Sequence, residues 1–439
     1  MLKGTDIRFY PMWWILFTLA FCIVIIPKKT VGSIAVGLDD LICLALLPFV
    51  LWFLLSESWL FKGWRLGLLC IWLMIVFTGI VYGLLGSAYY LEQLTIPTEM
   101  WQYMKRLIFF YFTLYLAWNR KISSERFYSV LVVVVVVAAL MGIIQVLPGS
   151  AGRTLANVYA RTDVVKSKLL DRSFFLARNY GIAGHSIAWG GFSAFSVAIA
   201  ASCLAAGRQY TKDLKLFTRL LIWSLLLMSL FNVVLSGSKA SILSLLVILT
   251  VILSDTIYRN RRNIRFMVKL SIMMGTFVSL TAYFLMSRLA YLMYRVMSLL
   301  ETRGGGRLEQ VNMALALVND WFSPFFGVGN VYQRAMATSF GTEVEPVFLF
   351  VNYGLVGVLL RYGLLAIVLM ISWRLVARST GADRILAMAA VSSILGYAFF
   401  SLGYFFFQEI YVGLLPWLLY GWVVGRYFRQ SRDRQIGLA

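Results

Sequence analysis

Charged side chains and histidine are scarce in this sequence of 439 residues. Asp, Glu, Lys and Arg make up 13% of the chain, about half of the roughly 25% found in soluble proteins. This composition excludes a soluble globular enzyme and a disordered protein. The single histidine, His185, argues against a histidine-based metal site. The four cysteines lie in apolar runs without a CxxC pair, so we interpret them as small buried residues.

Motifs of several enzyme classes are also absent. The sequence has no GxxxxGK[ST] phosphate-binding loop, no HExxH and no GxSxG. The glycines Gly304–Gly306 lack a surrounding strand–helix unit, so we interpret them as a flexible turn. Chemistry driven by ATP is therefore not expected. The acidic residues are too scattered to predict a divalent-metal site, and we expect neither a metal nor another cofactor.

Long apolar runs are abundant. Hydrophobic residues make up 61% of the chain, and long apolar runs recur from Met12 to Trp422. Because about 20 apolar residues cross a hydrocarbon core, these runs predict an all-α polytopic membrane protein with about twelve transmembrane helices. It would form a single transmembrane domain over residues 1–439, with two long periplasmic loops. The predicted spans are 11–27, 34–55, 64–85, 103–118, 127–147, 179–207, 216–235, 240–258, 266–287, 346–373, 385–404 and 408–425.

The basic residues predict the orientation of these spans. The chain has 40 Lys and Arg against 19 Asp and Glu, a balance that would suggest nucleic acid in a soluble domain. In a membrane protein the positive-inside rule explains it, so we expect no nucleic-acid partner. With the N-terminus in the cytoplasm, most basic residues fall in cytoplasmic loops, and both termini are cytoplasmic. Arg259, Arg261 and Arg262 form the densest cluster, whereas Lys28 and Lys29 go against the rule.

Two outer connections, 148–178 and 288–345, are long and basic. One interpretation is that long loops cross regardless of charge and that their arginines aid solubility. The other is an outward-facing anion site, because the planar guanidinium suits phosphate oxygens. The basic residues are Arg153, Arg161, Lys166, Lys168, Arg172 and Arg178 in the first loop, and Arg288, Arg295, Arg303, Arg307 and Arg334 in the second.

The second loop also contains one amphipathic segment. Within Leu308–Phe322, the apolar residues Leu308, Val311, Leu315 and Val318 share one helical face. This spacing predicts a short helix that lies on the membrane surface or covers a cavity. The stretch Pro324–Gly329 then predicts a turn.

Three polar residues lie where outer loops meet predicted spans. Lys239 follows Ser236-Gly237-Ser238 in a tight turn, where it either extends toward the membrane surface or binds an anion at a helix start. Glu343 and Glu345 come just before Pro346. A carboxylate there either stabilises a helix start or acts as a general base.

Other ionisable residues lie within the apolar runs. Asp39 and Asp40 fall in the outer half of the second span, where such residues are functional candidates, although a role in helix packing is equally consistent. His185 begins the sixth span. A lone histidine is more often a hydrogen-bonded packing residue than a catalytic one.

Four short motifs occur in an order that fits the predicted spans and loops. They are Arg178–Gly181 (RNYG), which leads toward His185; Ser236–Ala240 (SGSKA); Arg307 followed by Trp321 and Pro324–Gly329 (PFFGVG); and Gly354–Gly357 (GLVG). Together with about twelve spans and two long outer loops, these motifs resemble the O-antigen polymerase/ligase superfamily of bacterial envelope glycosyltransferases, which are GT-C-like membrane enzymes. Lys239 stands where the superfamily's Ser-Arg turn has arginine.

One departure from the superfamily separates two of its activities. The ligases carry a histidine a fixed distance before the Gly-x-x-Gly motif, and Glu343 occupies that position here. The resemblance therefore implies an O-antigen polymerase, or a polymerase of a related surface polysaccharide, rather than a ligase that transfers glycan to lipid A core.

The resemblance implies an enzyme of the bacterial inner membrane whose active site faces the periplasm. Its donor and acceptor would be oligosaccharides linked to undecaprenyl diphosphate, and its other partners the membrane lipid and a chain-length regulator. The implied diphosphate-binding residues are Arg178, Arg307, Arg303, Lys239, Arg172 and Arg106, and the implied catalytic residues are Glu343, Glu345 and His185. Two alternatives stay open, a ligase and a flippase or other transporter, although no inverted pair of interrupted helices is evident.

Overall fold

The computed structural model of this protein describes residues 10–27, 29–31, 34–56, 63–90, 98–160, 163–170, 178–206, 216–260, 307–319, 321–328, 343–405 and 413–435, with the single positions 275 and 279. Arg172 and Arg303 lie outside the described residues.

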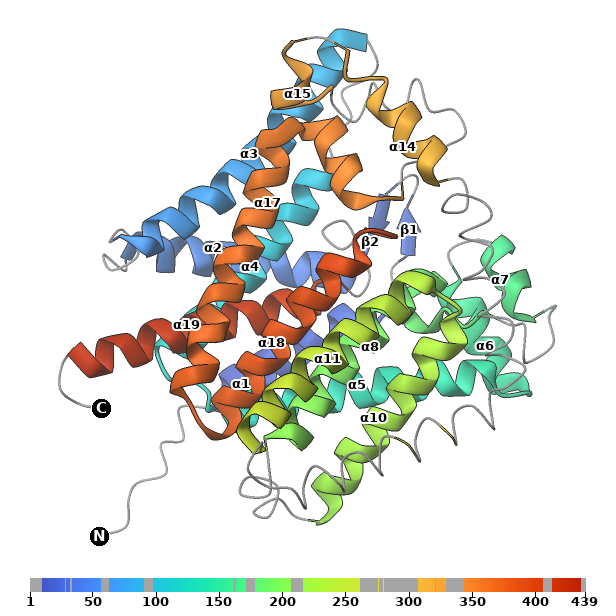
Figure 1. Ribbon diagram of the computed structural model, residues 1–439, viewed down its shortest axis with the longest axis vertical. Helices are drawn as coiled ribbons and strands as arrows, with labels where there is room; N and C mark the ends of the chain where they lie inside the picture. Colours follow the sequence, from blue (N-terminus) through green and yellow to red (C-terminus); the bar gives the residue numbers. More distant parts are fainter. Residues whose placement is uncertain are drawn as a thin grey trace.

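Helices dominate the described chain (Figure 1). A helix occupies every predicted span except 266–287, which lies almost wholly outside the described residues. In chain order the elements are α1 (Tyr10–Val24), β1 (Lys29–Val31), β2 (Ile34–Val36), α2 (Leu38–Ser56), α3 (Trp64–Tyr90), α4 (Thr98–Trp118), α5 (Ser124–Val146), α6 (Ser150–Tyr159), α7 (Asp163–Leu170), the 3-10 helix η3 (Gly181–Ala183), α8 (Ser186–Ala205), α10 (Leu216–Ser236), α11 (Lys239–Asn260), α14 (Arg307–Leu315), α15 (Ser323–Phe326), α17 (Glu345–Arg378), α18 (Gly381–Phe400) and α19 (Leu415–Gln435).

Eight of the described helices are long and apolar enough to cross a membrane: α2, α3, α5, α8, α10, α11, α17 and α18. Large apolar side chains also face outward, among them Leu55, which is 77% exposed, and Phe77, which is 64% exposed. Soluble proteins rarely expose such patches, whereas hydrocarbon accommodates them. The described chain therefore has the architecture of a polytopic membrane protein.

The described residues are helical, as predicted, apart from one short element: β1 and β2 form an antiparallel hairpin in which Thr30 pairs with Ala35. Two predicted span starts need correction. The span predicted to begin at residue 34 begins at Leu38, after this hairpin. The span predicted to begin at residue 179 begins at Ser186, because 179–185 is a polar and glycine-containing turn.

The two predicted outer loops contain short helices. The first carries α6 and α7. In the second, the helix expected over Leu308–Phe322 ends at Leu315 and is followed by the single turn of α15. On the predicted apolar face Leu308 and Leu315 are exposed, which fits a helix at a surface rather than one packed in a core.

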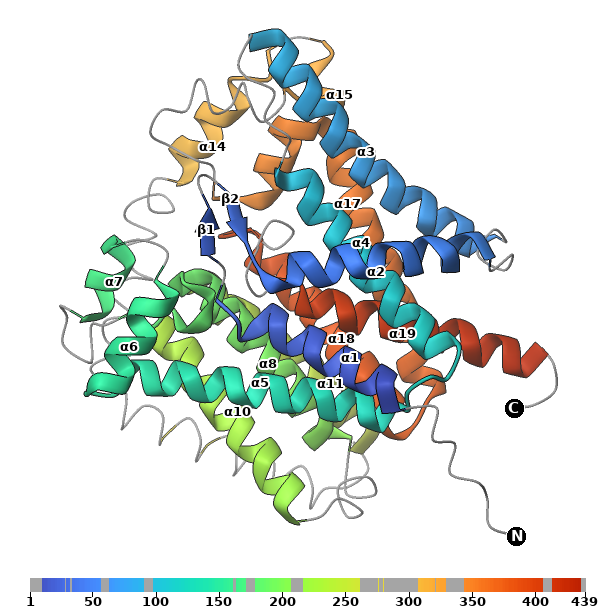
Figure 2. The ribbon, with the colours of Figure 1, turned by 180° about the vertical axis from the view of Figure 1, so that it is seen from behind.

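Two groups of helices make up the body of the molecule. In the first, α8 contacts α5, α10, α11 and α18, and nearly all its side chains are buried. In the second, α17 and α4 contact α3, and α14 and α15 lie at the end of α17 (Figures 1 and 2). The groups are joined because α18 of the first group contacts α17 of the second, and because α19, which packs on α4 and α17, also contacts α18.

The long helix α17 is broken at Gly354, whose φ of 62° and ψ of −168° are not helical. The α15 turn enters this break. A Cβ atom on Gly354 would lie 2.2 Å from the carbonyl of Phe325, and one on Gly327 would lie 2.3 Å from the backbone of Asn352. The amide of Val328 donates a hydrogen bond of 2.7 Å to the carbonyl of Val351. Glycine is therefore required at both positions by the close approach of two backbones.

Candidate functional site

The starts of α8 and α17 contact the turn Ser401–Phe405 that follows α18, and the start of α11 packs against the start of α8. We call this region the helix-start corner. Its candidate functional residues are Arg178, His185, Lys239 and Glu345, with Glu343 just before α17.

Arg178 is held against the end of α10. Its Nε donates to the carbonyl of Ser236 at 3.3 Å, and the amide of Asn179 donates to the carbonyl of Leu235 at 3.0 Å. The Arg178 side chain is half-buried. These two bonds fix the segment before α8 beside the turn that carries Lys239.

Buried amides explain why residues 178–181 take this path. The Asn179 Nδ2 donates to Asn232 Oδ1 on α10 and to the carbonyl of Gly142 on α5, both at 2.9 Å. Asn179 Oδ1 accepts from the amide of Gly181 at 2.8 Å. Gly181 has a φ of 46°, and a Cβ there would lie 2.2 Å from the indole of Trp189. The amide groups of Asn179 and Gly181 therefore find hydrogen-bond partners inside the helix bundle, as is usual for buried polar groups.

The turn between α10 and α11 positions Lys239. Ser238 Oγ accepts a hydrogen bond of 3.3 Å from the amide of Ser241, which stabilises the first turn of α11. Lys239 is the first residue of α11 and is half-buried. Ser241 Oγ also donates to the carbonyl of Ile187 at 3.3 Å. The start of α11 is therefore packed against the start of α8.

His185 precedes α8 at its N-cap position. Its ring stacks on that of Tyr404, with centroids 5.2 Å apart and 9° between the planes. Tyr404 in turn contacts Phe400 and Phe405. His185 is half-buried, so part of its side chain is exposed at the surface of the corner.

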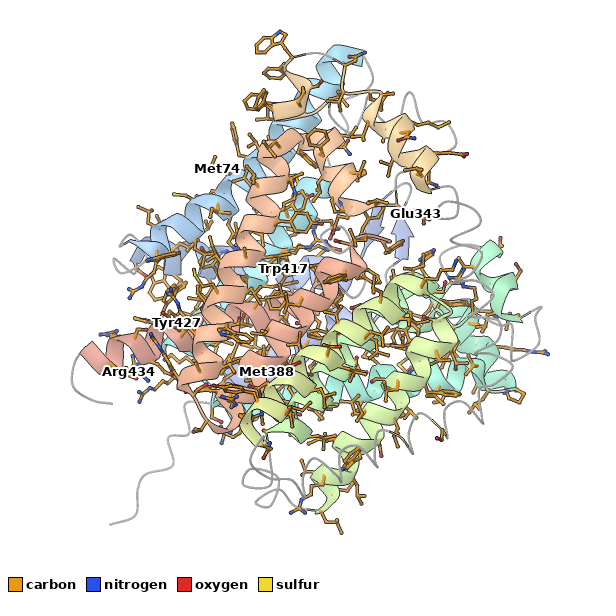
Figure 3. The ribbon with its side chains drawn as sticks, viewed as in Figure 1. Met74, Glu343, Met388, Trp417, Tyr427 and Arg434 are labelled. Carbon is orange, nitrogen blue, oxygen red and sulfur yellow. The ribbon has the colours of Figure 1, made fainter. Side chains whose placement is uncertain are left out.

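The two predicted carboxylates differ in accessibility. Glu345 is the first residue of α17 and is completely buried. Its amide donates to the carbonyl of Ser401 at 2.9 Å, which joins α17 to the end of α18. Glu343 lies two residues earlier and is half-buried. In Figure 3, Glu343 lies on the side of the molecule where α18 ends and the β1–β2 hairpin is found.

Contacts between aromatic rings connect the start of α8 to the start of α17 across the corner. Phe405 contacts Tyr404 at 5.7 Å and Phe348 at 5.1 Å between ring centroids. Phe348 lies one turn beyond Glu345 on α17. The chain of contacts thus runs from His185 through the Ser401–Phe405 turn to the start of α17.

Two tyrosines anchor the first loop beside the corner. The Tyr159 hydroxyl on α6 donates to the carbonyl of Ile25, and the Tyr180 hydroxyl donates to the carbonyl of Ala156 at 2.8 Å. Burial disfavours the phenolate and raises the pKa of Tyr159 to about 12. The pKa of Tyr180 is also raised by burial. Both phenols stay neutral, which fits a role as fixed hydrogen-bond donors.

Arg106 lies on α4, beside the part of α17 whose Tyr362 donates a hydrogen bond of 3.1 Å to Ser401 of the corner. Its guanidinium carbon is 5.6 Å from the ring of Tyr103, within the buried face of α4. The same ring lies 4.6 Å from the guanidinium of Arg361, which is also 4.0 Å from the ring of Tyr353. Arg106 and Arg361 are completely buried. The structure thus pairs Arg106 with an arginine that the sequence analysis did not single out.

A second buried cluster contains Asp39 and Asp40. The ammonium of Lys105 lies 2.9 Å from a carboxylate oxygen of Asp39 and 2.6 Å from one of Asp40. The indole of Trp101 donates to Asp40 at 2.7 Å. The two carboxylates therefore form an ion cluster between α2 and α4. Lys105 and Arg361 were not predicted, although a basic residue inside an apolar run was the available signal.

Arg307 is the first residue of α14, which contacts α17, and the structure describes its backbone only. Among the residues that the structure describes, no three His, Cys, Asp or Glu side chains gather as a group able to hold a metal ion.

The chain matches no family model and no curated protein sequence.

Proposed function

We propose that this protein is a membrane glycosyltransferase that polymerises oligosaccharide repeat units carried on undecaprenyl diphosphate, with its site at the helix-start corner on the periplasmic face of a bacterial inner membrane. The product would be O-antigen or a related surface polysaccharide. The observation that carries the proposal is a path of contacts among apolar helices that could span a membrane. It joins Arg178 and the α11 start, where Lys239 lies, through the His185–Tyr404 stack to the start of α17, where Glu345 lies.

A diphosphate would bind near Arg178 and Lys239. Arg178 is fixed beside the α10–α11 turn by its bond to the Ser236 carbonyl. Lys239 begins α11, and the start of a helix favours a negative charge. Arg307 would reach the same ligand from the second loop. These three cations would stabilise the charge that develops on the departing diphosphate.

The proton acceptor would be Glu343. A hydroxyl of the acceptor sugar attacks the anomeric carbon of the donor, the bond from that carbon to the phosphate oxygen breaks, and undecaprenyl diphosphate leaves. The hydroxyl proton passes to Glu343, which is partly exposed. Glu345 is completely buried and begins α17, so it is assigned to stabilising that helix start. His185 would line the acceptor side through its stacked position on Tyr404.

The test uses purified protein in lipid nanodiscs with a defined undecaprenyl-diphosphate repeat unit, and measures product length on gels. Arg178→Ala and Arg307→Ala are each expected to lower the rate by about a hundredfold, because each removes a donor to the developing charge. Glu343→Gln is expected to lower it by at least about a hundredfold. Arg153→Ala is the control, since Arg153 is an exposed arginine of the first loop. Wild-type rates in all three variants would refute the assignment.

The alternatives make different products. Loss of a polymerase leaves lipid A core carrying a single repeat unit, loss of a ligase leaves core without any repeat, and loss of a flippase strands single units on the inner face. The break of α17 at Gly354 favours transport, because interrupted helices mark transporter sites. Against this, α15 of the same chain fills the break. The glycan pattern of a deletion strain separates the three.

A further inference from the structure

A cluster of arginines surrounds Trp118 at the other end of the molecule, where α4 and α19 end and α3 begins. We call it the Trp118 cluster. The guanidinium carbon of Arg65 lies 5.3 Å from the centre of the Trp118 ring, and that of Arg432 lies 5.4 Å from it. Arg65 also lies 5.3 Å from the ring of Phe428. Trp118 itself is buried. One indole thus holds two like-charged side chains in one place by cation–π attraction.

The cluster carries an excess of positive charge. Asp433 accepts a hydrogen bond from Arg120 and forms an ion pair with Arg429, whose Nε lies 3.1 Å from a carboxylate oxygen of Asp433. Arg120 and Arg429 share Asp433, while Arg65 and Arg432 share the Trp118 ring, so four guanidinium groups lie in this part of the described structure. Like charges at this spacing repel each other, and a bound anion relieves that repulsion.

The backbone at Arg120 supports a role for its side chain. Its φ of 51° lies in the left-handed region, which normally favours glycine after a helix end. The amide of Lys121 donates to the carbonyl of Leu116 at 3.0 Å and closes this turn. An arginine here costs about 1 kcal/mol or more in backbone strain relative to an unstrained conformation.

The surroundings of the cluster are those of lipid. Trp64, next to Arg65, is 62% exposed, and an exposed indole at the end of a span is typical of the membrane–water interface. Farther along α3, Leu73, Met74 and Phe77 are also exposed. This apolar face offers contact to acyl chains, whereas a free phosphate would use only the arginines. Figure 3 labels Met74 on α3 and Arg434 at the end of α19, both away from Glu343.

We propose that the Trp118 cluster binds the headgroup of an anionic phospholipid, with Arg65 and Arg432 on its phosphate and the acyl chains along the exposed face of α3. The planar guanidinium forks match phosphate oxygens. This site is separate from the helix-start corner. Arg426, on the same helix α19 as Arg432, donates at 2.6 Å to Asp383 in the first turn of α18, whereas Ser401 of the corner follows the last turn of α18.

The test measures binding and needs no activity. Delipidated full-length protein in neutral detergent is titrated with short-chain phosphatidylglycerol, and retained lipids are counted by native mass spectrometry while the melting temperature is recorded. Parallel titrations use short-chain phosphatidylcholine and inorganic phosphate. We expect saturable binding of phosphatidylglycerol with a rise in melting temperature, and weaker responses to the other two probes.

Arg65→Gln and Arg432→Gln are each expected to weaken phosphatidylglycerol binding about fivefold, as the loss of one charge at a membrane surface predicts. Arg374→Gln is the matched control, because Arg374 is an exposed arginine near the end of α17 and outside the cluster. Arg432 is exposed on the last turns of α19, so its variant keeps the test valid if Arg65→Gln does not fold.

Three results would overturn the proposal. Equal binding of phosphatidylcholine would show that charge is not recognised. An equal response to inorganic phosphate would show that the arginines bind a free anion. Equal weakening by Arg374→Gln would show a diffuse surface attraction in place of a site.

Discussion

Two buried basic clusters lie on different faces of α4. One holds an ammonium group between two carboxylates, and the other places guanidinium groups on aromatic rings. Lys105 points to Asp39 and Asp40 of α2, at 2.9 and 2.6 Å. Its chain neighbour Arg106 lies with Arg361 of α17 around the ring of Tyr103. We call these the lysine cluster and the arginine cluster.

The difference follows from the two side chains. An ammonium is a compact and strongly hydrated charge, so its burial is tolerated when carboxylates replace the water. A guanidinium is planar and more weakly hydrated, so aromatic faces and carbonyls can surround it. Arg361 accordingly stacks on Tyr103 and Tyr353, donates to the Tyr103 hydroxyl at 3.2 Å and donates to the carbonyl of Gly357 at 3.2 Å.

The largest effect is expected from Lys105→Met in the lysine cluster. This change takes the ammonium of Lys105 away from two buried carboxylates, and removing one partner of such a pair costs about 3–5 kcal/mol of the free energy of unfolding. Denaturant titration of the purified protein measures it. The triple variant Lys105→Met, Asp39→Asn, Asp40→Asn is expected to recover most of the loss. A Lys105→Met protein as stable as wild type would mean that the carboxylates are neutralised in another way.

Arg361→Met tests the arginine cluster and is expected to cost less, about 2 kcal/mol, because it removes the stacking on Tyr103 and Tyr353 and the hydrogen bonds to the Tyr103 hydroxyl and the Gly357 carbonyl. Arg361→Lys should recover less than half of the loss, since an ammonium has neither the planar stacking surface nor the fork. The same denaturant titration applies. A loss equal to that of Lys105→Met would remove the distinction between the clusters.

Gly357→Ala probes the space that the arginine cluster needs. A Cβ at Gly357 would lie 2.1 Å from the Cβ of Tyr353 and 3.2 Å from a nitrogen of Arg361. We expect a loss of about 1–3 kcal/mol from overpacking. Gly363→Ala on the same helix is the control, because nothing lies within 4 Å of its Cβ position. That change should stabilise α17 by about 0.5–1 kcal/mol. Melting temperatures compare the two, and equal behaviour would contradict the packing argument.

An uncharged contact gives the smallest effect and a baseline for both clusters. Tyr159→Phe removes one buried hydrogen bond to Ile25 and should cost about 1 kcal/mol at neutral pH. The Tyr159 pKa is raised from 10.0 to about 12 in the folded protein. The stabilisation of the folded protein by the neutral Tyr159 phenol is therefore complete below pH 10 and is lost as the pH rises through about 12. Unfolding measured against pH should show this loss in wild type and not in the variant.

The apolar runs predicted the helices well, because the length of each run indicates a helix without any knowledge of the elements that pack against it. The errors occur where polar or small residues interrupt a run. Residues 34–36 were assigned to a span although they pair as a strand with 29–31. The stretch 179–185 was assigned to α8, but the Asn179 amide bonds to α5 and α10 instead of continuing a helix.

Several of the predicted site residues lie near one another in the fold, and their catalytic and binding roles stay predictions. Arg178, Lys239, His185 and Glu345 lie at the helix-start corner, and Glu343 directly precedes it. Arg106 was placed with them because its position in the chain suggested an outer helix end. It lies beside Arg361, whose neighbour Tyr362 bonds to Ser401, and the face on which a residue of α4 lies depends on how α4 packs against α17.

Composition alone decided that this chain is built of apolar helices, because a backbone in hydrocarbon must satisfy its hydrogen bonds within each helix. Which charge meets which partner was decided only by the tertiary structure. Lys105 and Arg106 are adjacent in the chain, yet one lies against carboxylates 65 and 66 residues earlier and the other beside an arginine of the distant α17. A helix turns successive side chains to different faces, so neighbours in sequence meet different parts of the fold.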